Sequence, residues 1–190
     1  MPGGFFFRQY QGVKKIHVLL ADTDSRGPEP RHAGPLRTVL QNNGILYTYA
    51  AGEEEAAERL RNDESIDLLL MRLPSRDRTE ADGFVAVEAA KRLTAIRKLP
   101  LVYSIAGGTG MGVQKKIRES DVYGIIEASA GEFTVLETLD RARELFQVRK
   151  EKEKTAAELQ SVYSYIPVIF VLLDKESRIK KVNAFTSAYT

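Results

Sequence analysis

The stretch IHVLLADTD, residues 16–24, is an apolar run that ends in acidic residues. Similar short apolar runs follow it, most of them flanked by Gly, Pro or acidic residues: ILYTYA at 45–50, IDLLLM at 66–71, PLVYSIA at 100–106 and VYGII at 122–126. Such runs are typical of strands that are buried on both faces. Stretches with helix-like composition separate them, at 35–42, 53–61, 84–97 and 113–119. The alternation predicts an α/β fold, a parallel sheet covered on both faces and connected by right-handed crossovers.

The composition is that of a globular protein, with 190 residues, 43% of them hydrophobic and 28% charged. This length favours one domain with an additional segment. A formal net charge of only +2 gives no strongly basic surface, so we expect no nucleic-acid partner. The absence of cysteine excludes disulfides, a thiolate nucleophile and Cys-ligated metals. We therefore expect no cofactor.

The two histidines leave little material for a metal site. His17 lies inside the first predicted strand, where we expect a buried or edge side chain with a hydrogen-bond partner. His32 is expected at the surface before the first helix. The apolar stretch at Phe5 to Phe7 is too short for a signal peptide, and the run at 166–173 is far shorter than the ~20 residues of a membrane helix. We expect a cytoplasmic protein without membrane insertion.

A long helix is predicted after residue 131, because no Gly or Pro interrupts the chain from Glu132 until Pro167. Val135, Leu139, Ala142 and Phe146 follow a coiled-coil spacing, which continues through Arg149, Glu153, Ala156, Gln160 and Tyr163. The charged run at 149–154 weakens this seam. Two interpretations stay open: a solvated helix with i,i+4 ion pairs, or a signalling coil in a homodimer.

Residues 164–190 have a different pattern. A strand is predicted before a turn at Asp174 to Ser177, a second strand spans Arg178 to Val182, and a helix begins near Asn183. A segment of this size does not close a core by itself. We expect it to be the first part of a second domain.

The order and spacing of these features resemble the receiver domain of two-component response regulators. The resemblance covers about residues 14–147 and is carried by Asp22 and Asp24 after the first strand, Leu73-Pro74 and Asp82-Gly83-Phe84 after the third, and Pro100 before the fourth. It implies a doubly wound, flavodoxin-like sheet of five parallel strands in the order 2-1-3-4-5.

The C-terminal segment is similar to the start of a PAS sensor domain, with two strands and the first helix. The residues that carry this resemblance are Ile166-Pro167, Leu173-Asp174, Arg178-Ile179 and Val182-Asn183. The expected organisation is then an N-terminal extension at 1–13, a receiver-like domain at 14–147, a helical linker at 148–163 and a PAS fragment at 164–190.

A receiver transfers a phosphoryl group to an aspartate, and this chemistry needs Mg²⁺ carboxylates, a hydroxyl donor and a cation. The resemblance places the metal carboxylates at Asp22 and Thr23, so only Asp22 remains, as a vestigial metal ligand. The hydroxyl position falls on Ile105, with Ser104 one residue away and expected on the opposite sheet face. The lysine position falls on Glu127, whose carboxylate repels phosphate.

The phosphoacceptor position has two alternatives. Counting back from Pro74 gives Leu70, and counting forward from Asp67 gives Arg72. Neither side chain accepts a phosphoryl group. The resemblance therefore implies a pseudo-receiver, a non-enzymatic module that acts by contact with other signalling proteins through the helical linker and the PAS segment.

Two other functions remain as alternatives. In the first, a loop aspartate after Pro74, Asp77 or Asp82, replaces the phosphoacceptor, although Asp82 more simply caps the next helix. In the second, the glycine-rich loop from Gly107 to Gly112 binds an anion or a nucleotide. That loop has Met111 and Gly112 where a P-loop has its lysine and hydroxyl.

Overall fold

The computed structural model describes residues 16–22, 34–74, 79–105, 107, 109–183 and 185. The chain divides into two compact units, Met1–Phe146 and Gln147–Thr190. Several residues singled out in the sequence lie outside the described part: the extension at 1–13, Thr23, Asp24, His32 and Asp77.

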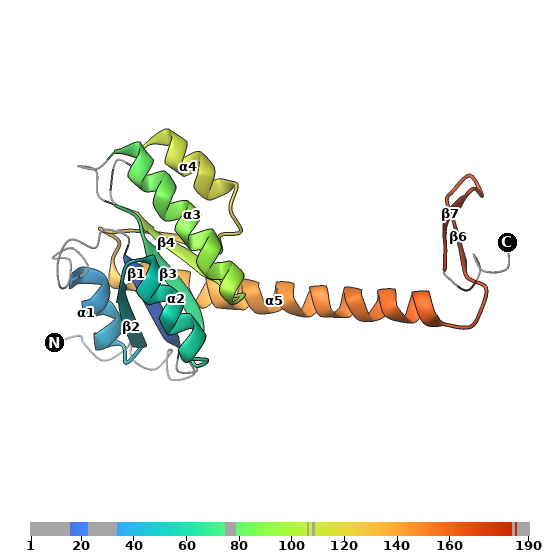
Figure 1. The fold of residues 1–190 in the computed structure, drawn as a ribbon, viewed down its shortest axis with the longest axis horizontal. Coiled ribbons are helices and arrows are strands. Elements are labelled where there is room, and N and C mark those ends of the chain that lie inside the picture. Colours follow the sequence, from blue (N-terminus) through green and yellow to red (C-terminus); the bar gives the residue numbers. More distant parts are fainter. Residues whose placement is uncertain are drawn as a thin grey trace, which may run out of the picture. The chain divides into compact units, whose positions relative to one another are not determined.

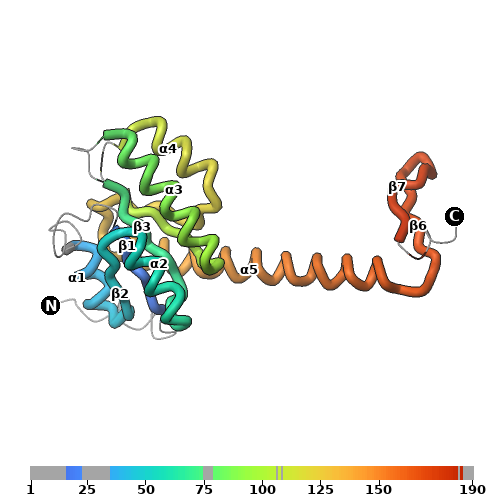
Figure 2. The backbone as a smooth tube through the Cα atoms, viewed as in Figure 1, coloured from blue at the N-terminus to red at the C-terminus, as the bar shows by residue number. Residues whose placement is uncertain are grey.

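Five parallel strands form the sheet of the first unit, in the order β2-β1-β3-β4-β5. Figure 1 labels β1 to β4 of this sheet. They are β1 (His17–Asp22), β2 (Leu46–Ala51), β3 (Leu68–Arg72), β4 (Leu101–Ile105) and β5 (Gly124–Glu127). Strands β1 and β3 are buried at every position, as expected for central strands covered on both faces. The order confirms the predicted flavodoxin-like receiver fold, and Figure 2 traces the elements along the backbone.

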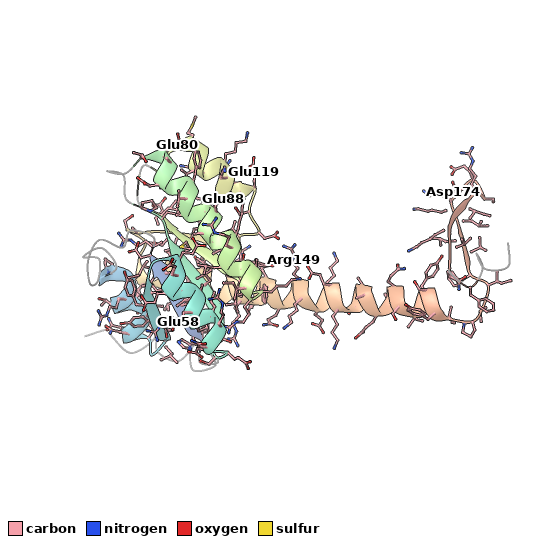
Figure 3. All side chains as sticks on the ribbon, viewed as in Figure 1. Glu58, Glu80, Glu88, Glu119, Arg149 and Asp174 are labelled. Atoms are coloured by element: carbon pink, nitrogen blue, oxygen red, sulfur yellow. The ribbon has the colours of Figure 1, made fainter. Side chains whose placement is uncertain are left out.

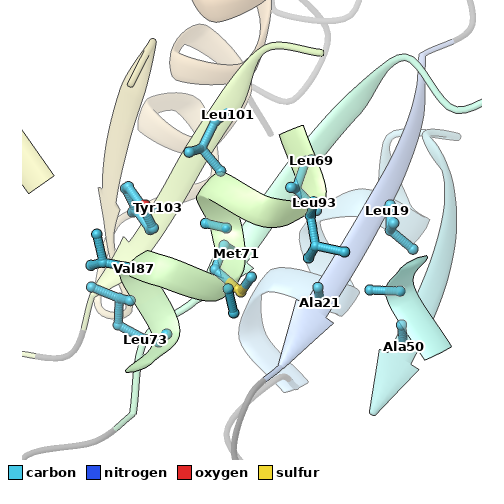
Figure 4. Close-up of a cluster of buried hydrophobic side chains, with 14 of the residues drawn as sticks. Leu19, Ala21, Ala50, Leu69, Met71, Leu73, Val87, Leu93, Leu101 and Tyr103 are labelled. Carbon is cyan, nitrogen blue, oxygen red and sulfur yellow. The ribbon is translucent and has the colours of Figure 1, made fainter. Parts of the chain in front are cut away.

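The helices form a layer on each face of this sheet. They are α1 (Gly34–Asn42), α2 (Glu53–Asn62), α3 (Glu80–Ile96), α4 (Met111–Arg118) and α5 (Glu132–Tyr165). Helices α2, α3 and α4 bury apolar side chains against one face, where Leu69, Met71 and Tyr103 lie (Figure 4). Helix α1 and the first part of α5 pack on the other face, against Leu68, Leu70 and Val102. Alternate residues of each strand thus point to opposite helix layers.

Two glycines allow close approach between elements. A Cβ added at Gly83 in α3 would stand 2.7 Å from a methyl group of Val113 in α4. One added at Gly124 in β5 would stand 2.6 Å from the methyl group of Thr138 in α5. Each glycine therefore sets how closely a helix packs, and Gly83 gives the Asp82-Gly83-Phe84 motif a structural role.

The residues predicted as a dimer seam lie inside the first unit. Val135, Leu139 and Ala142 are at most 1% exposed and pack with α1 and the sheet. Phe146 places its ring edge-on against Tyr123, with centroids 5.4 Å apart. The assignment of Val135, Leu139 and Ala142 to a dimer contact is wrong, because the 3–4 spacing that suits a coiled coil also suits a helix packed on a sheet. For Phe146, which is half-buried, the dimer contact stays a prediction.

The second unit contains the rest of α5 and an antiparallel pair, β6 (Val171–Leu173) and β7 (Ile179–Val182). The turn between them is held by Asp174, whose Oδ1 accepts hydrogen bonds from the backbone N–H of Glu176 and Arg178. The side chain of Asn183, at the end of β7, holds the segment before β6. Its Oδ1 accepts a hydrogen bond from the Phe170 N–H, and its Nδ2 donates one to the Val168 carbonyl. The predicted strand, turn and strand are confirmed, while their assignment to PAS stays a prediction. None of the described helices is both long and apolar enough to span a bilayer.

Candidate functional site

The carboxyl ends of the two central strands bring one acidic and one basic side chain together. Asp22 ends β1, Arg72 ends β3, and the two residues are paired in the sheet register. Arg72 Nη1 donates a hydrogen bond to Asp22 Oδ2 over 2.6 Å. The Asp22 side chain is 1% exposed and that of Arg72 is 11% exposed. This is a buried, charge-assisted contact at the sheet edge where receiver chemistry is expected.

Burial of the ion pair between Asp22 and Arg72 makes its separation energetically costly. Two ions removed from water lose several kcal/mol of hydration each, which only close mutual contact and further hydrogen bonds offset. If one partner is removed, the other remains as an uncompensated buried charge. The guanidinium of Arg72 therefore has a structural reason to stay against Asp22.

The two positions that the sequence left open for the phosphoacceptor differ in placement. Leu70 lies inside β3, fully buried in the apolar cluster against α1 and α5. Arg72 lies at the strand end beside Asp22. Of the two, only Arg72 is adjacent to the carboxylate that the resemblance assigns to the metal.

The neighbouring strand β4 places Ser104 level with this pair. Ser104 is paired with Arg72 in the register and is 2% exposed. Ile105, the predicted hydroxyl position, packs on the α2, α3 and α4 side. Ser104 lies on the sheet face opposite that of Ile105, as expected, and the register of β3 and β4 places it level with Arg72.

Glu127 does not lie beside the ion pair of Asp22 and Arg72. It follows the buried Ile126 in β5, is itself exposed, and is paired in the register with Ile105. Because side chains alternate along a strand, Glu127 points to the face opposite that of Ile126. The register therefore sets Asp22, Arg72 and Ser104 level with one another on one face of the sheet, whereas Ile105 and Glu127 lie on the opposite face. Leu70 lies on the same face as Arg72, two residues earlier in β3.

These residues do not fit the Mg²⁺ ion of the receiver family. A magnesium site needs oxygen ligands and retained waters, whereas the oxygen of Asp22 is already in contact with a cation. Within the described ranges, no group of three or more His, Cys, Asp or Glu side chains is placed to hold a metal. A divalent cation at Asp22 would meet the positive charge of Arg72. The sequence signal for this arrangement is an arginine in a buried strand, which requires a carboxylate partner.

The loop aspartate proposed as a substitute acceptor has another role. Thr79 Oγ1 accepts from the backbone N–H of Asp82, and Asp82 Oδ2 accepts from the Thr79 N–H at 3.1 Å. This is a capping box, which satisfies donors at the first turn of α3. The prediction that Asp82 caps the helix is confirmed.

The glycine-rich loop ends at the first turn of α4, where a carboxylate of the chain already sits. Glu80 Oε1 accepts a hydrogen bond from the Gly112 N–H over 2.9 Å, and Glu80 lies at the start of α3 (Figure 3). A Cβ at Gly112 would overlap this oxygen. A helix N-terminus attracts anions, but here the side chain of Glu80 takes that place and repels phosphate. The nucleotide-binding alternative loses its main support.

His17 has the expected hydrogen-bond partners, at the amino end of β1 and away from Asp22. Its Nδ1 contacts Ser65 Oγ at 2.7 Å, and its Nε2 contacts Thr48 Oγ1 at 2.8 Å. Ser65 Oγ also donates to Asp63 Oδ1 at 2.6 Å. The hydrogen bonds that the side chain and the backbone N–H of Ser65 donate to Asp63 lower the pKa of that carboxyl group. The cluster ties β1 to β2 and to the loop before β3.

No protein-family model matches the chain, and no curated protein matches it in sequence. Solved structures do match its fold. A fusion protein that carries the trimeric coiled coil of yeast Spc42 has a TM-score of 0.60 and 22% identity, over 78% of this chain and 89% of that one. The N-terminal domain of a response regulator/sensory box/GGDEF protein from Carboxydothermus hydrogenoformans has a TM-score of 0.55 and 22% identity, over 70% and 98%.

A CheY-like receiver domain from Methanospirillum hungatei is similar at a TM-score of 0.55 and 14% identity, over 72% of this chain and 99% of that one. At these identities the likeness concerns the fold alone. The chain therefore has the fold of response-regulator receiver domains, with a buried ion pair at the strand ends.

Proposed function

We propose that this chain is a pseudo-receiver, a signal-transduction module that keeps the receiver fold and does not use aspartyl phosphorylation as its switch. The observation that carries the proposal is the buried contact between Asp22 and Arg72. It sets a guanidinium beside the carboxylate that the family uses for its metal. The fold of its structural neighbours supports the broader role in signal transduction.

The chemistry of the strand ends supports the loss of phosphorylation. A guanidinium is protonated at any physiological pH and has no lone pair with which to attack a phosphorus atom. Leu70 has no nucleophilic atom either. The remaining carboxylate, Asp22, is held by Arg72 and is 1% exposed, so a phosphodonor does not reach it without breaking a buried ion pair.

The proposed mode of action is protein contact without catalysis. Receiver domains are in general non-catalytic signalling domains, and α5 continues without interruption from the sheet into the second unit. We propose that changes in packing around the sheet pass along α5 to a PAS-like segment, in a cytoplasmic homodimer that binds other signalling proteins. The Carboxydothermus protein likewise joins a response-regulator part to a sensory box.

Amide NMR with beryllofluoride and Mg²⁺ tests the proposal. We expect the amide shifts of the strand ends to stay unchanged, since there is no acceptor for the phosphoryl analogue. Arg72→Asp is the informative variant, because it places a second carboxylate beside Asp22; Leu70→Asp is its matched control. We expect Mg²⁺ to raise the Tm of Arg72→Asp and not that of Leu70→Asp. Saturable shifts at Asp22 in the unmodified chain would contradict the proposal.

A further inference from the structure

Asn183 differs from the rest of the second unit in its burial. It is 1% exposed, whereas every residue of β6 and β7 is exposed. Among the residues that the structure describes in this unit, it is the one that is buried. A polar side chain is stable in such a place only when its hydrogen-bonding groups have partners. The burial of Asn183 therefore indicates specific contacts rather than general packing.

The side chain of Asn183 contacts the segment by which the chain leaves α5. Its Nδ2 donates hydrogen bonds to the carbonyl oxygens of Val168 and Ile166, over 2.8 and 3.3 Å. Its Oδ1 accepts from the Phe170 N–H over 3.2 Å, and its backbone N–H donates to the Phe170 carbonyl. Helix α5 ends at Tyr165. Asn183 thus joins the end of β7 to the residues that follow the helix.

Lys181 connects the same strand to the helix itself. Its Nζ donates to Gln160 Oε1 over 2.9 Å and lies 4.8 Å from the centre of the Tyr163 ring. An ammonium group over an aromatic face is attracted by the negative charge of that face. The Tyr163 ring also meets the Phe170 ring edge-on, with centroids 5.2 Å apart. Both β7 and the segment before β6 therefore contact the end of α5.

The charge of Lys181 suits its place at the end of a helix. The last carbonyl groups of a helix carry a partial negative charge, which a nearby cation stabilises. The last turn of α5 contains no basic residue of its own. Lys181 brings a cation to Tyr163 in that turn, so the helix end and β7 stabilise each other.

We propose that Asn183 and Lys181 form a clamp that makes the end of α5 and the strand pair one conformational unit. A displacement or local opening of α5 then reaches β6 and β7 directly and is not absorbed by the segment after Tyr165. The inference rests on the proposed function in one respect, the role of α5 as the element that passes on the signal. It adds the residues through which the strand pair receives that signal.

Amide hydrogen exchange of the 190-residue chain tests the clamp. Ala157 is exposed on α5, and Ala157→Gly weakens the helix end while both clamp residues remain. The lower helix propensity of glycine raises local opening by up to about fivefold. The Asp174 N–H, which donates to the Arg178 carbonyl in the turn between β6 and β7, reports on the strand pair. We expect its exchange to accelerate severalfold with the helix substitution.

Removal of the clamp should abolish this response. In Lys181→Met and in Asn183→Ala, Ala157→Gly should leave exchange at Asp174 unchanged. Lys180→Met is the matched control, because Lys180 is the neighbouring exposed lysine of β7, and it should keep the full response. If Asn183→Ala by itself abolishes protection of the strand pair, Lys181→Met, which keeps the buried amide, decides the test.

A proton NMR measurement reports on the clamp without a change in stability. The ε-CH₂ protons of Lys181 should be shifted upfield by the ring current of Tyr163, and Tyr163→Leu should remove that shift. Lys180 in the same spectrum is the internal control and should show no such shift in either chain.

Three results would overturn the clamp: an ordinary Lys181 shift, no response at Asp174 in the unmodified chain, or an equal response in Lys181→Met. None of them bears on Asp22 and Arg72 in the first unit. Failure of the clamp is therefore distinguishable from uptake of a phosphoryl group, which would contradict the proposed function.

Discussion

At the scale of single residues, two ion pairs have the same nitrogen–oxygen distance of 2.6 Å and different surroundings. The pair between Arg72 and Asp22 is buried, whereas the pair between Arg92 and Glu53 is on the surface, with 57% and 34% of the side chains exposed. In water the surface pair has little net effect on stability. In the interior, loss of one partner exposes the other to a medium that does not hydrate it.

Replacement of one partner at each site measures this difference. We expect Arg72→Met to lower the free energy of unfolding by about 3–5 kcal/mol, because Asp22 remains buried and charged. Arg92→Met, the matched control, should lower it by less than about 1 kcal/mol. The combined change Asp22→Leu with Arg72→Met should recover most of the loss. Urea unfolding checks all three, and equal losses at the two sites would contradict a buried ion pair.

Tyr103 gives a prediction on alkaline stability. Burial raises the pKa of its phenol to about 12, above the value near 10 of an unfolded tyrosine. Since the neutral form is favoured in the folded state, its contribution is complete below about pH 10 and is lost as the pH rises toward about 12.

The unmodified chain should therefore lose up to about 3 kcal/mol more stability than Tyr103→Phe over this range. Urea unfolding at pH 9, 10 and 11 measures the difference. Tyr165→Phe is the control, because Tyr165 is 84% exposed. Parallel pH profiles for the unmodified chain and Tyr103→Phe would show that the phenol is not buried in solution.

At the scale of elements, the contact between Glu80 and Gly112 couples α3 to α4. Alanine in a helix is more stable than glycine by about 0.5–1 kcal/mol. At Gly112 the added Cβ would displace the Glu80 carboxylate from the N–H it accepts. Gly112→Ala should thus gain less in the unmodified chain than when Glu80→Ala is also present. In that background the gain should reach at most about 0.5–1 kcal/mol, because the Phe84 ring, 3.2 Å from the added Cβ, still has to shift.

A double-mutant cycle by thermal unfolding measures this coupling. Gly107→Ala serves as control, since an added Cβ there has no neighbour within 4 Å, and its effect should be independent of Glu80. If Gly112→Ala were equally stabilising in both backgrounds, Glu80 would not cap α4.

The strand pair β6 and β7 is expected to be the least stable described element. Every residue of both strands is exposed, and an isolated two-stranded pair is marginal in water. Amide hydrogen exchange there should be much faster than at Val18 to Ala21 in β1, which are fully buried. Slow exchange at β6 and β7 would mean that another surface covers them.

The positions of the strands are predictable from the sequence. Which neighbouring element a given face of a helix or strand contacts is harder to predict. Uninterrupted apolar runs such as 66–71 identify buried strands, and their alternation with helices gives the fold class. Spacing alone does not distinguish a helix packed on a sheet from a coiled coil, so it assigns Val135 and Leu139 to the wrong contact. Strand alternation places Ser104 and Ile105 on opposite faces correctly, but counting from a motif does not show that Ser104 lies level with Arg72, because it does not give the register between β3 and β4.

At the scale of the whole molecule, the fold and the chemistry of the site depend on different residues. The receiver fold depends on apolar periodicity, which the sequence retains throughout residues 16–147. The site depends on a few side chains at strand ends. The sequence predicts Asp22 there and gives Arg72 only as an alternative position, because the contact between them needs the parallel register of β1 and β3.

The central claim is that this receiver fold does not take a phosphoryl group. Its most direct test is intact-mass measurement after treatment of the 190-residue chain with acetyl phosphate and Mg²⁺, alongside a phosphorylatable receiver domain as positive control. We predict an unchanged mass, because Arg72 occupies the position beside Asp22 and carries no nucleophilic atom. A phosphoryl adduct that maps to Asp22, Asp24, Asp77 or Asp82 would contradict this account.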